Sequence, residues 1–329
     1  MNPSLKKILV HQRDIISFVG KKIPYRLILR MQWSMLKSIR YISLPNIEYH
    51  YRIAKQCIIN DYLAAKYGDM VPQSLTYRDV EGFEESCPIW VFWWQGWDGQ
   101  LPALVDLCRR QLKKVSGKHT VIWLDKDNTF DYVTLPASVR EAFDRGDFTI
   151  THLSDIVRTA LLSTHGGLWL DSTMLSLTDP VAAVTKTPMW GTIKMHPQTK
   201  GEISDYRWGT FCLFSYPDNK VMKFFFDALC RYISDGHRKF LDYLLIDFFM
   251  ELLYRSNDEF RNLVDALPYS HEDLHLLEER LPLPPPPTYM PDLKDTTLFK
   301  LNRRYIPGTD DSVYHCLLKK FSDCPSSEQ

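Results

Sequence analysis

The chain lacks a run of about 18 uncharged apolar residues, roughly what a helix needs to cross a bilayer. Its first residues also lack the continuous apolar core and small-residue cleavage site of a secretory signal. Net charge is missing as well, because 40 Lys and Arg balance 40 Asp and Glu. We therefore expect neither a membrane-spanning helix nor a secretory signal, and we expect a cytoplasmic location.

The sequence also has no pattern of paired cysteines. The seven cysteines are odd in number and scattered, and no CxxC pair occurs. This spacing argues against a disulfide framework and against a thiolate metal site, and it suits a reducing compartment. A nucleophile elbow, a phosphate-binding P-loop and an HExxH motif are also missing. Any enzymatic chemistry must therefore come from another arrangement of residues.

What the chain does have is an ordinary globular composition with one uneven feature. Of its 329 residues, 45% are hydrophobic and 24% are charged, as in a soluble globular protein. Residues 1–40 hold nine Lys and Arg against one acid, Asp14, so the remaining residues sum to minus eight. Apolar and basic side chains interleave here, and we predict a helical basic arm over residues 1–80.

The predicted arm allows two interpretations. It either packs on the catalytic body with a solvated basic face, or it lies on the inner face of a membrane with its basic side chains toward anionic lipid. We expect no nucleic acid partner, because no platform of aromatic and basic residues accompanies the charge.

From Pro88 onward, short apolar runs alternate with helical stretches. We predict strands over residues 89–94, 120–124, 148–152, 168–170, 189–193 and 211–216, and helices over 101–113, 154–165, 219–234 and 240–254. Such alternation is typical of an α/β protein with a parallel, doubly wound sheet, whose ligands bind beyond the carboxyl ends of the strands. We place a catalytic domain at residues 81–280. Residues 281–329 are predicted as a proline-rich extended segment and tail.

Residues 151–173, THLSDIVRTALLSTHGGLWLDST, carry the clearest pattern. Apolar residues recur at helical spacing over 153–161, which predicts one stripe that faces the sheet. Ser154 is the candidate N-cap of this helix. Gly166 and Gly167 supply a left-handed stop after it.

Two charged residues of this helix, Asp155 and Arg158, lie three apart and therefore neighbour each other on its surface. Asp155 falls in the predicted first turn, where the helix dipole favours an acid. Taken alone, Asp155 and Arg158 are well explained as a surface ion pair that contributes little to stability. Asp171 changes this interpretation, because it ends the predicted strand at 168–170, where side chains reach a ligand. A strand-end carboxylate is also a sensible anchor for a divalent cation that bridges a diphosphate.

The order SDxxR, GG, an apolar pair and an aspartate at a strand end resembles the DXD-type sugar transferases that include the capsular polysaccharide synthesis proteins. The segment IWVFWWQGW at residues 89–97 resembles the first strand and tryptophan-rich turn of that family. WLDK at 123–126 and DYLLID at 242–247 match as well. The likeness covers about residues 87–254, and the combination of motifs is fairly specific.

The resemblance implies a GT-A-like, Rossmann-type sheet that binds a nucleotide-sugar donor, usually with Mn²⁺ or Mg²⁺ and with retention at the anomeric carbon. It implies that Asp155 binds sugar hydroxyls or the ribose, and that Arg158 binds the donor sugar or the diphosphate. Asp171 would hold the ribose and the metal. Gly166 and Gly167 would let the backbone turn close to the donor, which their conformational freedom favours independently.

One position departs from the family pattern. The full motif has a second carboxylate two residues after the first, where this chain has Thr173. A hydroxyl is a poorer metal ligand, although capsular-type relatives accept a threonine here. The sequence therefore leaves open whether Asp171 and Thr173 bind the cation directly. One arrangement that avoids a Thr173 ligand is a cation held by Asp171, the diphosphate, water and a group later in the chain.

The tryptophan-rich turn supplies further candidates. Trp93, Trp94 and Trp97 are candidates to stack on the nucleotide base or on a sugar face, whereas core packing is the alternative explanation for the strand members Trp90 and Trp93. Trp94 and Gln95, at the end of the predicted strand, are the better candidates for contact with the base.

Asp247 is a carboxylate within an apolar helix. It shares a helical face with Tyr243, Met250 and Tyr254. It is either a hydrogen-bonded structural group or an acceptor-site or catalytic group.

Together these features predict a glycosyltransferase that moves a sugar from a nucleotide-diphosphate sugar to an acceptor. We expect the donor to be a UDP-sugar, and the acceptor to be a glycan or lipid-linked glycan in capsular or exopolysaccharide synthesis. Positive charge from Arg158 and a cation would stabilise the departing diphosphate, and a carboxylate would stabilise the sugar cation. Two alternatives remain. A sugar-phosphate transferase would need a basic cluster around the diphosphate, which we do not find in the sequence. A catalytically silent sugar-nucleotide-binding scaffold is kept open by Thr173.

Overall fold

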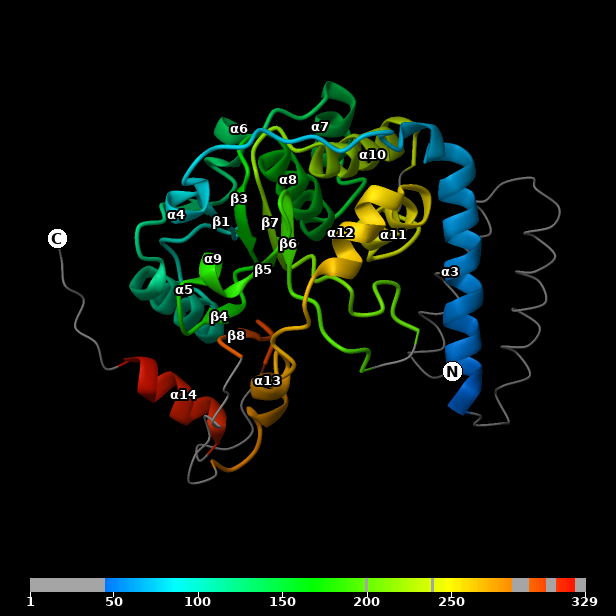
Figure 1. Cartoon of the computed structure of the whole chain (residues 1–329). Helices are drawn as coiled ribbons and strands as arrows, with labels where there is room; N and C mark the ends of the chain where they lie inside the picture. Colours follow the sequence, from blue (N-terminus) through cyan, green and yellow to red (C-terminus); the bar gives the residue numbers. More distant parts are fainter. Residues whose placement is uncertain (1–44, 199–200, 238–239, 286–295, 306–311, 323–329) are drawn as a thin grey trace.

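The computed structural model describes residues 45–198, 201–237, 240–285, 296–305 and 312–322 (Figure 1). The nine Lys and Arg of residues 1–40 therefore lie outside the described residues, and so does the prediction of a basic helical arm there. Within the described ranges, no helix is both long and apolar enough to span a bilayer.

A six-stranded mixed sheet lies at the centre, in the order β2-β1-β3-β7-β6-β5. The strands are β1 (Ile89–Phe92), β2 (Val121–Leu124), β3 (Gly167–Leu170), β5 (Thr185–Lys186), β6 (Trp190–Thr192) and β7 (Cys212–Ser215). The β2, β1 and β3 strands are parallel, as predicted. The pairs β3–β7, β7–β6 and β6–β5 are antiparallel, so the prediction of a wholly parallel sheet is wrong for this half of the sheet. A short turn joins β5 to β6, which antiparallel pairing allows and a parallel crossover does not.

Alternating side chains of the sheet divide the core into two layers. Trp90, Phe92 and Trp169 face one layer, whereas Ile89 and Leu168 face the other. This follows from the two-residue repeat of a strand. Because both faces are covered, β1 and β3 are buried along their whole length, which is why both read as continuous apolar runs in the sequence.

Helices cover both faces of the sheet (Figure 1). The face with Trp90 packs against α8 (Ile150–Thr164), α10 (Lys220–Ser234) and α11 (Leu245–Ser256). The opposite face packs against α5 (Ala103–Val115) and α9 (Pro180–Ala183). Further short helices of the body are η2 (Gly68–Met70), α4 (Phe83–Ser86), α6 (Thr129–Tyr132), α7 (Ala137–Asp144) and α12 (Asp258–Ala266). The sheet is therefore a helix-covered α/β core, as the sequence predicted.

A small third layer lies beyond α5. It contains a two-stranded antiparallel sheet of β4 (Met174–Ser176) and β8 (Leu298–Lys300), with α13 (Leu276–Arg280) and α14 (Val313–Ser322). Cys108 of α5, Phe299 of β8 and Leu317 of α14 share its apolar core. The described parts of the C-terminal region therefore fold against the body, where the sequence predicted an extended segment and a tail. In Figure 1 this layer lies below the main sheet.

Helix α8 begins earlier than predicted. Residues 148–152, predicted as a strand, enter the helix at Ile150. The N-cap is Thr149 rather than Ser154, and its hydroxyl accepts the His152 backbone N–H at 3.4 Å. Apolar side chains alternate with threonines in this short stretch, as they would in a strand. The N-cap and the longer helical repeat nevertheless favour a helix here.

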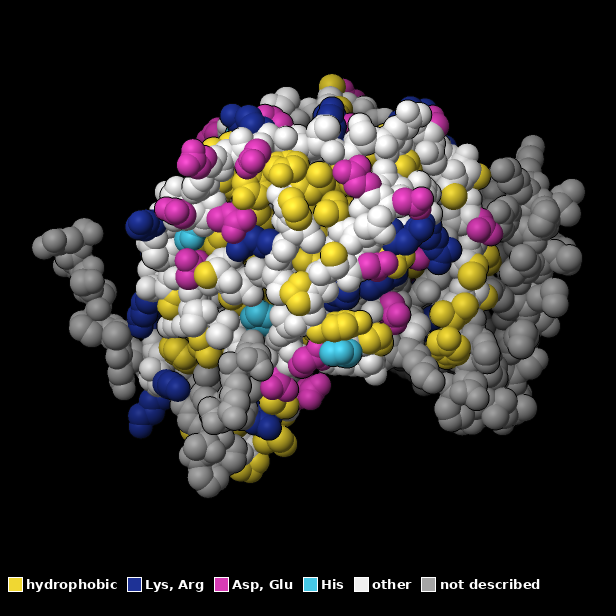
Figure 2. All heavy atoms as spheres, in the orientation of Figure 1, with side chains coloured by type: hydrophobic (Ala, Val, Ile, Leu, Met, Phe, Trp, Pro, Cys, Tyr) yellow, Lys and Arg dark blue, Asp and Glu magenta, His cyan; other side chains and the backbone are white. Residues whose placement is uncertain are grey.

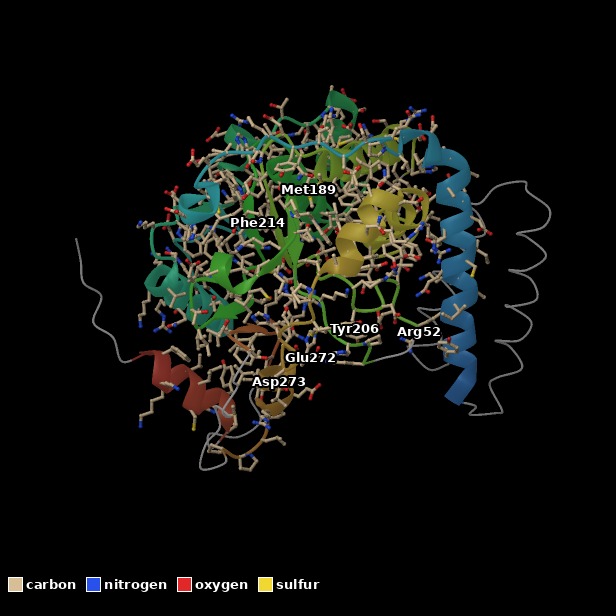
Figure 3. All side chains as sticks on the ribbon, in the orientation of Figure 1. Arg52, Met189, Tyr206, Phe214, Glu272 and Asp273 are labelled. Atoms are coloured by element: carbon tan, nitrogen blue, oxygen red, sulfur yellow. The ribbon has the colours of Figure 1, made fainter. Side chains whose placement is uncertain are left out.

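Helix α3 (Pro45–Tyr67) runs along one edge of the molecule, beside α11 (Figure 1). The buried Tyr67 ring meets Phe249 edge-on, with ring centroids 5.5 Å apart. Figure 3 shows Arg52 extending from α3 toward the loop between β6 and β7, where its Nη1 lies 3.4 Å from Glu202 Oε1. The described end of the predicted arm is therefore part of the folded body.

Charged side chains of both signs share the face shown in Figure 2. Lys and Arg lie among Asp and Glu there, with apolar areas between them. This mixture matches the balanced composition of the chain and contrasts with the basic sequence of residues 1–40.

Candidate functional site

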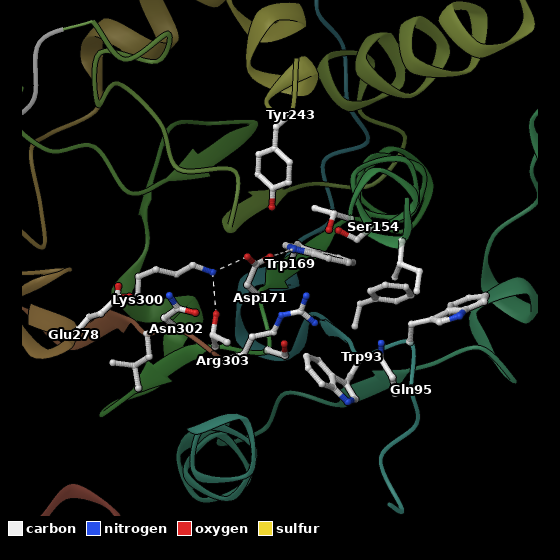
Figure 4. Close-up of a pocket in the computed structure, with 17 residues that line it drawn as sticks. Trp93, Gln95, Ser154, Trp169, Asp171, Tyr243, Glu278, Lys300, Asn302 and Arg303 are labelled. Carbon is white, nitrogen blue, oxygen red and sulfur yellow. Dashed lines mark hydrogen bonds and ion pairs between the residues drawn. The ribbon is translucent and has the colours of Figure 1, made fainter. Parts of the chain in front are cut away.

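A pocket of about 420 Å³ opens where β1 and β3 end (Figure 4). Trp93 and Gln95 border it after β1, and Asp171 borders it after β3. Ile150 at the start of α8 and Lys300 of β8 supply further walls. The volume lies within the range of about 300–1,000 Å³ that is usual for small-molecule sites. The carboxyl ends of parallel strands are also where α/β sheets bind ligands, so this pocket is the candidate site.

The three charged residues singled out in the sequence meet beside this pocket. Arg158 Nη1 donates to Asp155 Oδ1 at 3.1 Å, and Arg158 Nη2 donates to Asp171 Oδ1 at 3.2 Å. The guanidinium also lies over the Trp169 ring, 4.9 Å from its centroid. One arginine therefore joins the helix carboxylate to the strand-end carboxylate, and the three side chains lie together, as a single donor site would require.

Asp155 and Arg158 are more deeply buried than predicted. Only 5% of the Arg158 side chain is exposed, against 28% of Asp171, and of the three only Asp171 borders the pocket. Because α8 starts at Ile150, Asp155 lies in its second turn and not in the first. We expected these two residues to form a surface ion pair or to contact the donor directly. Their burial fits neither expectation as well as it fits a role in positioning Asp171.

Asp171 is held from several directions. Trp169 Nε1 donates to its Oδ1 at 2.9 Å, and Lys300 Nζ donates to its Oδ2 at 2.7 Å. The same Lys300 ammonium group donates to Thr173 Oγ1 at 3.0 Å. Figure 4 shows these bonds at the centre of the pocket wall. Thr173, where the family pattern has a carboxylate, thus bonds a lysine.

The charges around Asp171 favour its ionised form. Burial alone would raise the pKa of Asp171, but Lys300, Arg158 and the Trp169 hydrogen bond hold it below its usual value. Burial raises the pKa of Asp155 to about 7, against the opposing effect of Arg158. The site therefore keeps a charged carboxylate at the pocket wall, with a second carboxylate beneath it that titrates near neutral pH.

Lys300 and Arg303 are site residues that the sequence analysis missed. In β8, Lys300 lies opposite Met174 of β4, and the Leu301 backbone N–H donates to the Thr173 carbonyl at 2.9 Å. This pairing carries Lys300 to Asp171 and leaves Arg303 at the pocket edge. The only signal in the sequence was a short apolar alternation followed by basic residues, which does not identify the partner strand.

The tryptophan-rich turn divides between pocket and core. Trp93, Trp94 and Gln95 border the pocket, as expected for contact with a base or a sugar. Trp97 is buried instead, and its Nε1 donates to the Leu124 carbonyl at 3.0 Å. Of the predicted stacking residues, Trp97 is therefore a core residue.

Gly166 and Gly167 lie at the opposite end of β3 from Asp171, and neither borders the pocket. Both have positive φ, 67° and 97°, which confirms the predicted left-handed stop. A Cβ on Gly167 would lie 2.3 Å from the Pro88 carbonyl oxygen, and one on Gly166 would lie 2.7 Å from the Ser215 carbonyl oxygen. Close backbone packing accounts for both glycines, and the structure gives them no approach to a donor in this pocket.

Asp247 does not border the pocket either. It lies in the first turn of α11, which begins at Leu245 rather than at residue 240 as predicted. Its Oδ1 accepts the Trp208 indole N–H at 3.0 Å, and burial raises the pKa of Asp247 to about 7. Of its expected neighbours, Tyr243 borders the pocket, and the Tyr254 hydroxyl donates to a different carboxylate. These contacts favour the structural interpretation of Asp247.

The groups around Asp171 fit a divalent cation poorly. Such a cation needs several oxygen ligands, and both oxygens of Asp171 already accept bonds from Trp169, Arg158 and Lys300. Across the described ranges, no three His, Cys, Asp or Glu side chains gather where they could hold a metal ion. The expected Mn²⁺ or Mg²⁺ at Asp171 stays a prediction, and this donor set does not favour it.

Comparison with known proteins gives three findings. A family model described as capsular polysaccharide synthesis protein matches residues 40–320. No curated protein matches the chain. A solved structure titled PaToxG Glycosyltransferase is similar at 13% sequence identity, with a TM-score of 0.39, over 66% of this chain and 84% of that chain.

Proposed function

This chain belongs to the capsular polysaccharide synthesis protein family, and from that premise we propose that it is a glycosyltransferase. In this proposal it moves a sugar from a nucleotide-diphosphate sugar to a glycan acceptor. The observation that carries the proposal is Asp171, a charged carboxylate at the end of β3 that borders a pocket of ligand size. Lys300 and Arg303 border the same pocket and suit an anionic leaving group.

The proposed reaction breaks the bond between the anomeric carbon and the diphosphate oxygen, which keeps the electron pair. The acceptor hydroxyl forms the new bond to the anomeric carbon, and its proton passes to the departing diphosphate. Positive groups at the pocket wall stabilise the diphosphate, and the Asp171 carboxylate stabilises positive charge on the sugar. Trp93, Trp94 and Gln95 offer aromatic and amide surfaces for the base, which we propose to be uracil.

We also propose a class of acceptor. Family membership favours a glycan or lipid-linked glycan acceptor in capsular or exopolysaccharide synthesis, with retention at the anomeric carbon. Tyr243 is 63% exposed at the pocket rim, and Figure 4 shows its hydroxyl pointing toward Asp171. An aromatic ring at this place suits the apolar face of an acceptor sugar. A lipid-linked acceptor would place the protein at the inner face of the membrane.

A sugar-phosphate transferase is the second candidate, and one observation favours it. That reaction needs basic residues around the diphosphate, and Lys300 and Arg303 now provide them. The two reactions differ in the nucleotide they release, because sugar transfer leaves a nucleoside diphosphate and sugar-phosphate transfer leaves a nucleoside monophosphate.

The test is a panel of nucleotide sugars incubated with the full chain, with and without Mn²⁺, and with the released nucleotide identified by chromatography. We expect slow release of the diphosphate from one donor, since water replaces the acceptor. Release of the monophosphate would establish the second candidate instead. Binding of a donor without any turnover, even with added glycan acceptors, would indicate a silent scaffold.

A further inference from the structure

Lys300 bonds both residues that stand at the carboxylate positions of the family pattern. Its ammonium group bonds Asp171 Oδ2 at 2.7 Å and Thr173 Oγ1 at 3.0 Å. These are the two sequence positions whose carboxylates would hold a divalent cation in the full motif. Here the second position is a hydroxyl, and a cationic side chain bridges the pair. A cation supplied by the protein itself therefore stands where a diffusible one is expected.

The bonding capacity of these groups favours the lysine further. An ammonium group has three N–H donors, and Asp171 and Thr173 use two of them, so one can serve a phosphate oxygen. Asp171 Oδ1 meanwhile accepts bonds from Trp169 and Arg158. A divalent cation at Asp171 would have to displace Lys300 and then lie close to two positive side chains, which Coulomb repulsion disfavours.

Arg303 adds a second positive group on another side of the pocket. Its guanidinium lies over the Trp93 ring, 5.5 Å from the centroid. Figure 4 shows it between Trp93 and Asp171, so that it and Lys300 approach the same space from the β8 segment. A guanidinium suits two oxygens of a phosphate group, and an ammonium suits a single oxygen.

We propose that Lys300 and Arg303 bind the diphosphate of the nucleotide donor and neutralise its negative charge, as a divalent cation would. Donor binding then does not require metal. This inference rests on the proposed function and deepens it. Glu278 is the other carboxylate on the pocket wall, and Figure 4 shows it at the far end of the Lys300 side chain from Asp171. It therefore does not complete a carboxylate pair with Asp171.

The test measures binding of nucleoside diphosphates to the full chain by titration calorimetry. UDP, GDP, CDP, ADP and dTDP are compared in EDTA and in MnCl₂, and the tightest ligand is then used. We expect its Kd to differ by less than about threefold between the two conditions, because the cationic side chains are already in place. In EDTA, Lys300→Ala and Arg303→Ala should each weaken binding by about tenfold or more.

Three controls separate phosphate binding from a structural effect. The matched control is Arg304→Ala, which removes an exposed arginine next to Arg303 and should leave the Kd unchanged. Lys300→Arg should keep most of the affinity, since it preserves the charge. The nucleoside without phosphates should bind Lys300→Ala and the wild type equally, because only the charged part of the ligand meets Lys300.

Each outcome bears on the inference or on the proposed function beneath it. Binding that appears only with Mn²⁺ would overturn the inference and leave the proposed glycosyltransferase standing. Equal losses in Lys300→Ala and Arg304→Ala, or a loss of nucleoside binding in Lys300→Ala, would also overturn it. If no nucleoside diphosphate binds with or without metal, the proposed function fails together with the inference.

Discussion

Asp171 accepts hydrogen bonds from Trp169, Arg158 and Lys300, and its remaining surface borders the pocket. Its orientation is therefore fixed before any ligand arrives, which is what electrostatic stabilisation of a reacting sugar requires. Arg158 acts on the pocket through this carboxylate, since it is buried between Asp155 and Asp171. At the scale of single residues, the predicted motif supplies one residue that borders the pocket and two that position it.

A residue-scale prediction concerns Asp247 and pH. Burial raises the pKa of Asp247 to about 7 from its usual 3.8, so the folded state binds more protons than the unfolded state between these values. Its contribution to stability is therefore full below about pH 4 and is lost as pH rises toward 7. We expect Asp247→Asn to gain stability relative to the wild type over this interval, by up to about 4 kcal/mol. Urea unfolding at pH 5, 6, 7 and 8 measures this difference.

Asp258→Asn is the matched control, because Asp258 is exposed on α12 and, among the described residues, its side chain pairs with Arg261 at the surface. The difference between this control and the wild type should stay within about 0.5 kcal/mol at every pH. A constant difference between Asp247→Asn and the wild type from pH 5 to 8 would show that Asp247 does not titrate in this range.

At the scale of elements, the junction between α8 and β3 is set by two glycines. A Cβ on Gly167 would lie 2.3 Å from the Pro88 carbonyl oxygen, and its φ of 97° disfavours a side chain as well. We expect Gly167→Ala to lower the free energy of unfolding by about 2–4 kcal/mol. Nucleoside diphosphate affinity per folded molecule should be unchanged, because the glycine lies at the far end of the strand from Asp171.

Gly68→Ala provides the comparison for this experiment. Gly68 has ordinary φ and open space where a Cβ would lie, so its stability change should stay within about 1 kcal/mol. If Gly167→Ala kept full stability and lost nucleotide binding, the glycine would serve the donor, as the family resemblance implies, rather than the packing.

The sequence predicted those elements whose signals are local. The parallel β1, β2 and β3 strands and the meeting of Asp155, Arg158 and Asp171 follow from patterns within one stretch of chain. Lys300 bonds a residue 129 positions away, through a strand whose pairing no local pattern specifies. The predicted strand at 148–152 was wrong for the opposite reason, because a five-residue alternation is too short to outweigh a helix cap.

At the scale of the whole molecule, charge is distributed unevenly along the chain. Residues 1–40 hold nine Lys and Arg, whereas the rest of the chain sums to minus eight. Acidic and basic side chains are mixed on the face of the body shown in Figure 2. A basic N-terminal sequence on a mildly acidic body suits an anionic lipid surface, which would bring the pocket near a lipid-linked acceptor.

This proposal predicts that the full chain sediments with vesicles that contain phosphatidylserine and not with pure phosphatidylcholine vesicles. Replacing Lys6, Lys7, Lys21 and Lys22 by glutamine should weaken that binding, by about 1 kcal/mol per lysine at most. High salt should have the same effect on the wild type, because it screens the attraction.

Four lysines of the body serve as the control for the arm. They are Lys114, Lys118, Lys126 and Lys220. Replacing them by glutamine changes the net charge equally and should leave vesicle binding as it is in the wild type. Equal losses in the two variants would mean that total charge, and not the N-terminal sequence, determines the contact.

The most direct test of the central claim is the release of nucleoside diphosphate from the preferred nucleotide sugar by the wild type and by Asp171→Asn, in EDTA and at equal concentrations of folded protein. We predict that the wild type turns the donor over and that the variant loses at least about a hundredfold in rate, since the amide keeps the shape of Asp171 without its charge. Equal rates in the two proteins would contradict the account, because the pocket at the end of β3 would then not be where the sugar is transferred.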